Sequence, residues 1–256
     1  MIEDNDDIRD YILESLRDYC KVIAATNGKD GVEMAISKIP DIIISDIMMP
    51  VMDGIQACKI LKSNIATSHI PIILLTAKNT IEDKEKGYET GADSYITKPF
   101  SAKLLLNRIK NLLDTRRRLY NYIKDQLSDN VSADVKTLQE DQKPNVINDL
   151  DDRFLSALIS IIEDNITSER LDMEFIMEKF NMSHSTLYRK VKGLTGISTN
   201  EFIQKVKLRH AATLLKKGGM NVNEVAYASG FNSLSYFSAK FRKEYGVNPS
   251  QFQPQN

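Results

Sequence analysis

The stretch Asp41-Ile-Ile-Ile-Ser-Asp46-Ile-Met-Met-Pro50, continued by Val51-Met-Asp-Gly54, decides the fold of the first part of the chain. Its three consecutive isoleucines predict a short strand that is buried on both faces of a parallel sheet. The strand ends at Asp46, so a carboxylate stands at the carboxyl end, where open α/β sheets bind ligands. A proline and a glycine then predict a loop. Taken alone, an Asp after a strand is more often a cap or turn residue.

Strands and helices alternate around this stretch. We expect strands near 21–25, 41–45, 71–75 and 94–96, and helices near 6–18, 32–39, 53–64, 80–90 and from 101 onward. Such alternation predicts βαβ units and a parallel sheet. Asp46, Thr76 and Lys98 all fall at carboxyl strand ends, so we expect them to face one crevice. Glu3 and Asp4 would join them if a strand preceded them.

This set of residues suits phosphoryl transfer. Clustered carboxylates are costly to keep together without a cation, and all-oxygen ligands favour Mg²⁺. A carboxylate nucleophile beside Mg²⁺, a lysine and a hydroxyl makes a phosphoryl-transfer site. Lys98 would pair with phosphate oxygens, and Thr76 could hydrogen-bond the same group.

Residues 1–116 resemble the receiver domain of two-component response regulators. The match rests on Glu3-Asp-Asn5, Asp46-Ile-Met-Met-Pro-Val-Met-Asp-Gly54, Thr76-Ala-Lys78 and Tyr95-Ile-Thr-Lys-Pro-Phe100. The resemblance implies a flavodoxin-like parallel sheet of order 2-1-3-4-5, in which Asp46 accepts a phosphoryl group from a histidine kinase. It implies that Mg²⁺ is held by Glu3, Asp4, Asp46 and the backbone carbonyl of Met48. It also implies that Lys98, joined to Pro99 by a cis bond, holds the phosphate, and that Thr76 and Tyr95 form the switch pair.

The sequence departs from the family at its start. A receiver has a central first strand of about five apolar residues, and here only Met1-Ile2 precede Glu3. We therefore expect a truncated first strand. Either the chain was cut from a longer protein or its start is misplaced.

Apolar residues continue at helical spacing beyond the receiver, through Leu112, Leu119 and Ile123. Two interpretations stay open: a core-facing stripe with an extension, or a dimerising or signal-carrying helix. We expect residues 117–149 to form this helical extension followed by a polar, flexible linker.

Residues 150–256 predict an all-α domain with two helix-turn-helix units. A short helix, a tight turn and a basic second helix occur twice, near 173–192 and near 222–243. In the second unit we expect Leu234, Phe237 and Phe241 to point inward. The residues expected to face DNA are Ser185, Tyr188, Arg189, Lys192, Ser235, Tyr236, Lys240 and Lys243.

This half resembles the AraC/XylS family of DNA-binding domains. The match rests on Met182-Ser-His-Ser-Thr-Leu-Tyr-Arg-Lys190, Glu224-Val-Ala-Tyr-Ala-Ser-Gly-Phe231 and Phe241-Arg-Lys-Glu-Tyr-Gly-Val-Asn-Pro-Ser250. The resemblance implies two recognition helices in successive major grooves on one face of double-stranded DNA.

Charge and cysteine content agree with this division. Residues 170–256 carry 13 Lys/Arg against 6 Asp/Glu, whereas residues 1–169 carry 21 against 29. Such asymmetry indicates a basic nucleic-acid module joined to an acidic partner. Cys20 and Cys58 lack metal-ligand spacing, so we expect buried free thiols in a cytoplasmic protein. No apolar run approaches the roughly 18 residues of a membrane span, so we expect no membrane contact.

Together these features predict a phosphorylation-controlled transcription regulator that forms a homodimer when active. It would be no enzyme beyond its own phosphoryl transfer. The domain order resembles the tail of hybrid two-component sensors, in which the histidine kinase lies in the same parent chain. One alternative is an aspartyl-nucleophile phosphatase or phosphotransferase, although these enzymes usually carry a second Asp where this chain has Met48. Another is a degenerate receiver that only dimerises, which the intact Asp46, Thr76 and Lys98 disfavour.

Overall fold

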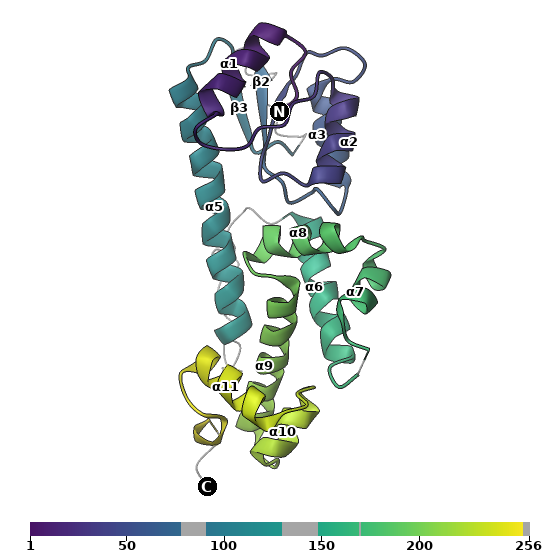
Figure 1. Cartoon of the computed structure of the whole chain (residues 1–256), viewed down its shortest axis with the longest axis vertical. Coiled ribbons are helices and arrows are strands. Elements are labelled where there is room, and N and C mark those ends of the chain that lie inside the picture. The colour runs from purple at the N-terminus through teal and green to yellow at the C-terminus, as the bar shows by residue number, and fades with distance from the viewer. Residues whose placement is uncertain (78–90, 130–147, 169, 253–256) are drawn as a thin grey trace. The chain divides into compact units, whose positions relative to one another are not determined.

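The chain folds into two compact units, shown in Figure 1 as a computed structural model. The structure describes residues 1–77, 91–129, 148–168 and 170–252. The first unit is built mainly from Met1–Arg118, and the second mainly from the residues after Asp152. Helix α5 (Ala102–Asp129) belongs to the second unit from Leu119 onward.

A parallel sheet forms the centre of the first unit. Strand β1 (Ile43–Asp46) pairs with β2 (Ile72–Thr76), which pairs with β3 (Ser94–Thr97). Ile2 bridges Ala25 on one side and Ser45 on the other, so the short first strand lies between them. This is the expected flavodoxin-like α/β architecture.

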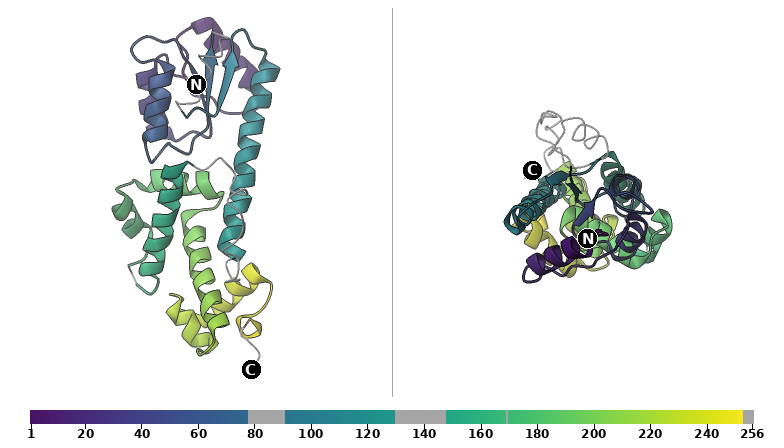
Figure 2. Two further views of the ribbon diagram at one scale, coloured as in Figure 1. Left: turned by 180° about the vertical axis from the view of Figure 1, so that it is seen from behind. Right: turned by 90° about the horizontal axis from the view of Figure 1, so that it is seen from above.

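Two apolar layers cover the sheet because side chains alternate along each strand. Ile43, Ile72 and Leu74 pack in a cluster with residues of α2 (Gly28–Lys38) and α3 (Gly54–Ser63). The neighbouring residues of the same strands pack with α1 (Asp6–Leu16) and α5 on the opposite face. The left view of Figure 2 shows the strands between the pair α2 and α3 on one side and α5 on the other. Burial on both faces explains why β1 and β2 are continuous apolar runs.

Some elements differ from the sequence-based expectation. No continuous strand forms at 21–25; only Ala25 pairs, because the strand beside it is limited to Ile2. The helix expected at 80–90 lies outside the described residues. Helix α5 continues past residue 116, as the apolar spacing predicted, and its Leu119 and Ile123 are 3% and 8% exposed. Both side chains are therefore buried.

The second unit contains most of α6 (Asp149–Asp164) and the two expected helix-turn-helix units. The first consists of α7 (Met173–Phe180) and α8 (His184–Thr195). Helix α9 (Thr199–Lys217) joins it to the second, which consists of α10 (Val222–Ala228) and α11 (Leu234–Tyr245). A short 3₁₀ helix, η2 (Pro249–Gln251), follows.

The second helices of the two helix-turn-helix units begin and end in the same way. Ser183 caps α8 by accepting a hydrogen bond from the backbone of Thr186, and Ser233 caps α11 in the same way through Tyr236. Both helices end at a glycine in the left-handed conformation. Serine caps and left-handed glycines set where a helix starts and stops, so local sequence signals define the ends of α8 and α11.

Aromatic rings fill the core of the second helix-turn-helix unit. Phe237 lies between Phe231 and Phe241, with ring-centroid distances of 5.1 and 5.5 Å. All three rings are buried, and together they fasten α11 to α9 and α10.

Two expectations from composition have mixed outcomes. Cys58 is buried as expected, but Cys20 is exposed because it follows the turn after α1. Among the helices in the described part of the chain, none has both the length and the apolar composition needed to cross a bilayer.

Candidate functional site

Asp46 ends strand β1 and is buried, with 7% of its surface exposed. Its backbone N–H donates to the carbonyl of Ile2 at 2.9 Å, and its Oδ1 accepts from the backbone N–H of Ile47 at 2.8 Å. Gly54 leaves room beside it, because a Cβ there would lie 2.0 Å from the carbonyl oxygen of Asp46. The backbone of Asp46 is therefore fixed from two sides.

Three carboxylates gather at this edge of the sheet. One oxygen from each of Glu3, Asp4 and Asp46 lies within 4.8 Å of the others. Glu3 is fully buried and Asp4 is exposed. Burial raises the pKa of Glu3, and a hydrogen bond from Lys98 opposes that rise. The short first strand positions both acids, because the backbone N–H of Glu3 donates to the carbonyl of Ala25 at 3.0 Å.

Lys98 joins the carboxylates from the end of β3. Its Nζ lies 2.9 Å from Glu3 Oε2 and 2.9 Å from Asp46 Oδ2. Burial alone would lower the pKa of Lys98, but the hydrogen bonds to Glu3 and Asp46 outweigh it and raise that pKa. The bond from Lys98 to Pro99 is cis, as the resemblance implied.

Charge balance makes this cluster a suitable cation site. When ionised, the three carboxylates carry three negative charges, and Lys98 supplies one positive charge. Hard divalent cations such as Mg²⁺ take oxygen ligands of this kind. The donor set therefore fits Mg²⁺, which would offset the remaining charge.

The other expected residues lie on or next to the same strands. Thr76 is the last residue of β2 and is 8% exposed, and its carbonyl accepts from the backbone N–H of Lys98 at 2.7 Å. Tyr95 of β3 lies opposite Leu74 of β2 and is half-buried. Met48 lies two residues after Asp46, with its side chain 72% exposed. The sequence thus placed Thr76, Lys98 and Asp46 correctly at neighbouring strand ends.

Arg9 was not anticipated. Its guanidinium donates to the carbonyl of Glu3 at 3.0 Å and to the carbonyl of Asp4 at 3.4 Å, and it pairs with Asp6. It therefore ties the acidic segment to the first turn of α1. The available sequence signal for this contact was a basic residue one turn into the helix that follows the acidic segment.

The residues expected to face DNA are mostly exposed on α8 and α11. Tyr188 and Lys240 are half-buried, and the rest are exposed, namely Ser185, Arg189, Lys192, Ser235, Tyr236 and Lys243. A tyrosine and a lysine four residues later form a stacked pair in each helix. Lys192 lies 5.5 Å from the ring centre of Tyr188, and Lys240 lies 5.3 Å from that of Tyr236.

One residue of these helices differs from expectation, and one basic residue lies in the core. Leu234 does not point inward; it is 40% exposed, because the first residue of α11 projects beyond the core that Phe237 and Phe241 occupy. Lys190 is fully buried over the ring of Phe154, so it belongs to the core of the unit.

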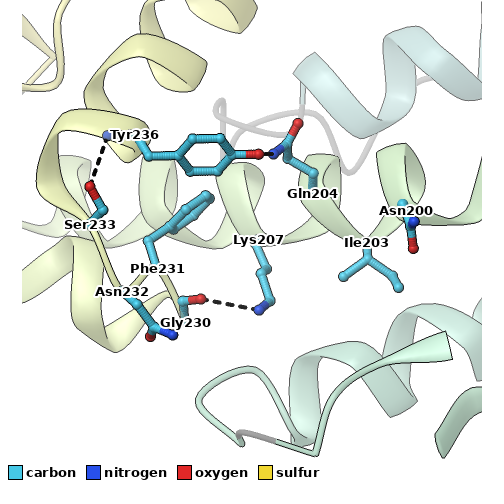
Figure 3. Close-up of a pocket in the computed structure, with 9 residues that line it drawn as sticks. All are labelled: Asn200, Ile203, Gln204, Lys207, Gly230, Phe231, Asn232, Ser233 and Tyr236. Carbon is cyan, nitrogen blue, oxygen red and sulfur yellow. Dashed lines mark hydrogen bonds between the residues drawn. The ribbon is translucent and has the colours of Figure 1, made fainter. Parts of the chain in front are cut away.

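Gln204 of α9 is a second residue that the sequence did not indicate. Its Nε2 donates to the hydroxyl of Tyr236 at 2.6 Å, as Figure 3 shows. The contact spans 32 positions of sequence. Sequence spacing carried no signal for it.

Comparisons with known proteins agree with this geometry. Residues 1–110 match the family described as "Response regulator receiver domain", and residues 176–255 match the one described as "Helix-turn-helix domain". Protein PilG of Pseudomonas aeruginosa is 45% identical over 91 residues, covering 36% of this chain and 67% of that protein.

A longer relative matches nearly the whole chain. Histidine kinase P4 of Formosa agariphila is 36% identical over 253 residues, or 99% of this chain. The chain spans only 18% of the length of that relative. Among solved structures, the receiver domain of a Pseudomonas aeruginosa PAO1 sensor histidine kinase was determined with magnesium in its active-site cleft. It is 28% identical and has a TM-score of 0.42, covering 44% of this chain and 93% of that one.

Proposed function

The chain belongs to the response regulator receiver family over residues 1–110 and carries an AraC-type helix-turn-helix domain over residues 176–255, and we propose that phosphorylation of Asp46 controls its binding to DNA. This is the domain composition of a two-component transcription regulator, not of an enzyme family. One observation carries the proposal: Lys98 contacts both Glu3 and Asp46 within a group of three carboxylates.

The phosphoryl transfer follows from these residues. An oxygen of Asp46 attacks the phosphorus of a phosphohistidine, the new O–P bond forms, and the P–N bond to the histidine breaks. Lys98 donates to an oxygen of the transferred group and offsets its charge. Glu3, Asp4, Asp46 and the backbone carbonyl of Met48 would hold Mg²⁺, which supplies further charge neutralisation when bound.

Thr76 and Tyr95 would report the change. Thr76 ends the strand beside Asp46, where its hydroxyl can move onto the phosphoryl group. Tyr95, on the neighbouring strand, would then turn its ring inward. Phosphorylation in this scheme biases an element that already has two arrangements.

The second unit would bind promoter DNA through α8 and α11. In this arrangement Arg189 and Lys240 reach bases or phosphates of successive major grooves, about 34 Å apart along the duplex. DNA binding and phosphotransfer both belong in the cytoplasm. We further propose that the active form is a homodimer.

A histidine kinase is the proposed phosphodonor, either within a longer chain that contains this segment or as a separate protein. A phosphatase or phosphotransferase is the weaker candidate, because Met48 carries no acid–base group. Turnover of an external phosphoester by the chain would revive that candidate.

The test uses acetyl phosphate and Mg²⁺ as the phosphodonor mixture. Wild type and Asp46→Ala are treated alike, phosphate incorporation is read by intact mass, and affinity is measured for a duplex that wild type selects from a randomised library. We expect incorporation and a changed DNA affinity in wild type only. An identical response from both proteins would remove the switch mechanism.

A further inference from the structure

A pocket of about 350 Å³ lies between α9 and the turn that leads into α11. Figure 3 shows its lining, which comes from one face of α9 and from the segment Gly230–Ser233 with Tyr236. Ile203 and Phe231 give it two apolar walls. The pocket is open to solvent and has a polar rim.

Lys207 gives the pocket its charge. None of the lining residues carries a carboxylate, and Lys207 is their single charged side chain. Its Nζ donates to the carbonyl of Gly230 at 3.1 Å. An ammonium has three N–H donors, so two are left over among the contacts that the structure describes. Burial lowers the pKa of Lys207, and no neighbouring acid is present among the lining residues to raise it.

A purely structural role accounts for only part of this arrangement. The bond to Gly230 satisfies a carbonyl just after α10, which is a favourable place for a cation. It does not explain why neutral hydrogen-bonding side chains surround the lysine. Asn200, Asn232 and Ser233 are exposed at the rim. A cation among neutral donors, with no acid beside it in the lining, is suited to an anion.

We propose that this pocket seats one phosphate of the DNA backbone, with Lys207 supplying the charge. This inference rests on the proposed function. Tyr236, one of the residues expected to face DNA, lines the pocket, so a duplex engaged by α11 brings its backbone to the rim. Helix α9 joins the two helix-turn-helix units, and the duplex backbone runs between two successive major grooves. The pocket is therefore placed to fix the register of the protein on DNA without reading sequence.

The test is a methylphosphonate scan of the duplex that wild type selects from a randomised library. Each methylphosphonate replaces one charged phosphate by a neutral one. At the seated phosphate we expect wild type to lose about fivefold to tenfold in affinity, as for one charge-assisted contact. Lys207→Gln should show no loss at that position and an unchanged pattern elsewhere, and Lys207→Arg should restore the loss. Lys217→Gln, on an exposed lysine of α9 outside the pocket, is the control.

A second variant covers the case in which Lys207→Gln fails to fold. Asn232→Asp adds a carboxylate at the exposed rim. It should weaken DNA binding and remove the affinity loss at the same position of the scan. Asn223→Asp, exposed on α10 outside the pocket, should do neither.

The outcomes separate the inference from the proposed function. A scan that Asn232→Asp leaves unchanged, from a wild type that binds DNA, overturns the inference alone. A wild type that selects no duplex overturns the proposed function as well. Calorimetry can also test whether the DNA-free chain binds inorganic phosphate. If it does, and Lys207→Gln abolishes this binding, the ligand of the pocket would be a free anion instead of a DNA phosphate.

Discussion

The ammonium of Lys98 lies 2.9 Å from a carboxylate oxygen of Asp46, although 52 positions separate them in sequence. The same ammonium lies 2.9 Å from Glu3, whose side chain has no exposed surface. Lys98 thus already occupies the position from which it would meet a phosphoryl group on Asp46. The same ion pairs therefore bear on the proposed phosphoryl transfer and on the stability of the first unit.

Lys98→Met should destabilise the first unit. It leaves the buried carboxylate of Glu3 without its partner, and such a loss typically costs about 3–5 kcal/mol. Chemical denaturation of the full chain measures the loss. Glu3→Gln combined with Lys98→Met should recover part of it, because the unpaired charge is then removed. Equal stability of the single and double variants would contradict this account.

The stability of the first unit should depend on pH through Glu3. Its pKa in the folded chain is raised above the ordinary 4.5, chiefly by burial. Its contribution to stability is therefore fully present below pH 4.5 and is lost as pH rises through the folded value. Relative to wild type, Glu3→Gln should gain stability over that window. Saturating Mg²⁺ should reduce the difference, because a bound cation favours the ionised carboxylate. Urea titrations across the window measure both effects.

Gly54→Ala should disturb Asp46 without touching a reactive group. The added Cβ would meet the carbonyl of Asp46 at 2.0 Å, so the backbone must shift. We expect a loss of about 3 kcal/mol in unfolding free energy, the upper end for overpacking. Phosphorylation by acetyl phosphate should also slow. Gly91→Ala is a useful comparison, since its Cβ would meet nothing closer than 3.6 Å and only its φ of +76° adds strain.

Adjacent residues of α8 should give opposite phenotypes. Arg189 is exposed, so Arg189→Ala should weaken DNA binding and leave the melting temperature nearly unchanged. Lys190 is fully buried over Phe154, so Lys190→Ala should lower the melting temperature first. Thermal melts and DNA titrations on both variants separate the two effects. Normal DNA affinity of a folded Arg189→Ala at moderate salt would contradict the assignment of α8.

Tyr236 should depend on Gln204 for DNA binding. Gln204 donates to the tyrosine hydroxyl, so the hydroxyl's own proton is left to donate to DNA. Tyr236→Phe should weaken binding by roughly tenfold, the worth of one good hydrogen bond. Gln204→Ala should weaken it less, and the double variant should be no weaker than Tyr236→Phe. Tyr227→Phe, an exposed tyrosine of α10, is the matched control. Additive losses would show that the two side chains act independently.

Most helices and strands, and most of the residues gathered around Asp46, could be predicted from the order of amino acids. Apolar runs and capping serines are local signals, so the residues of β1, β2 and both recognition helices could be assigned from the order of amino acids alone. Strand alternation then required Asp46, Thr76 and Lys98 to share one edge, because parallel strands end on the same side.

Which side chains meet, and which are buried, depends on the tertiary packing. The sequence indicated Leu234 as a core residue, but packing left it exposed. It carried no sign that Gln204 holds Tyr236 across 32 positions. Such contacts depend on how whole elements pack together, and local propensity carries no information about that. The reactive groups around Asp46 could therefore be predicted from the chain, whereas their ionisation and support could not.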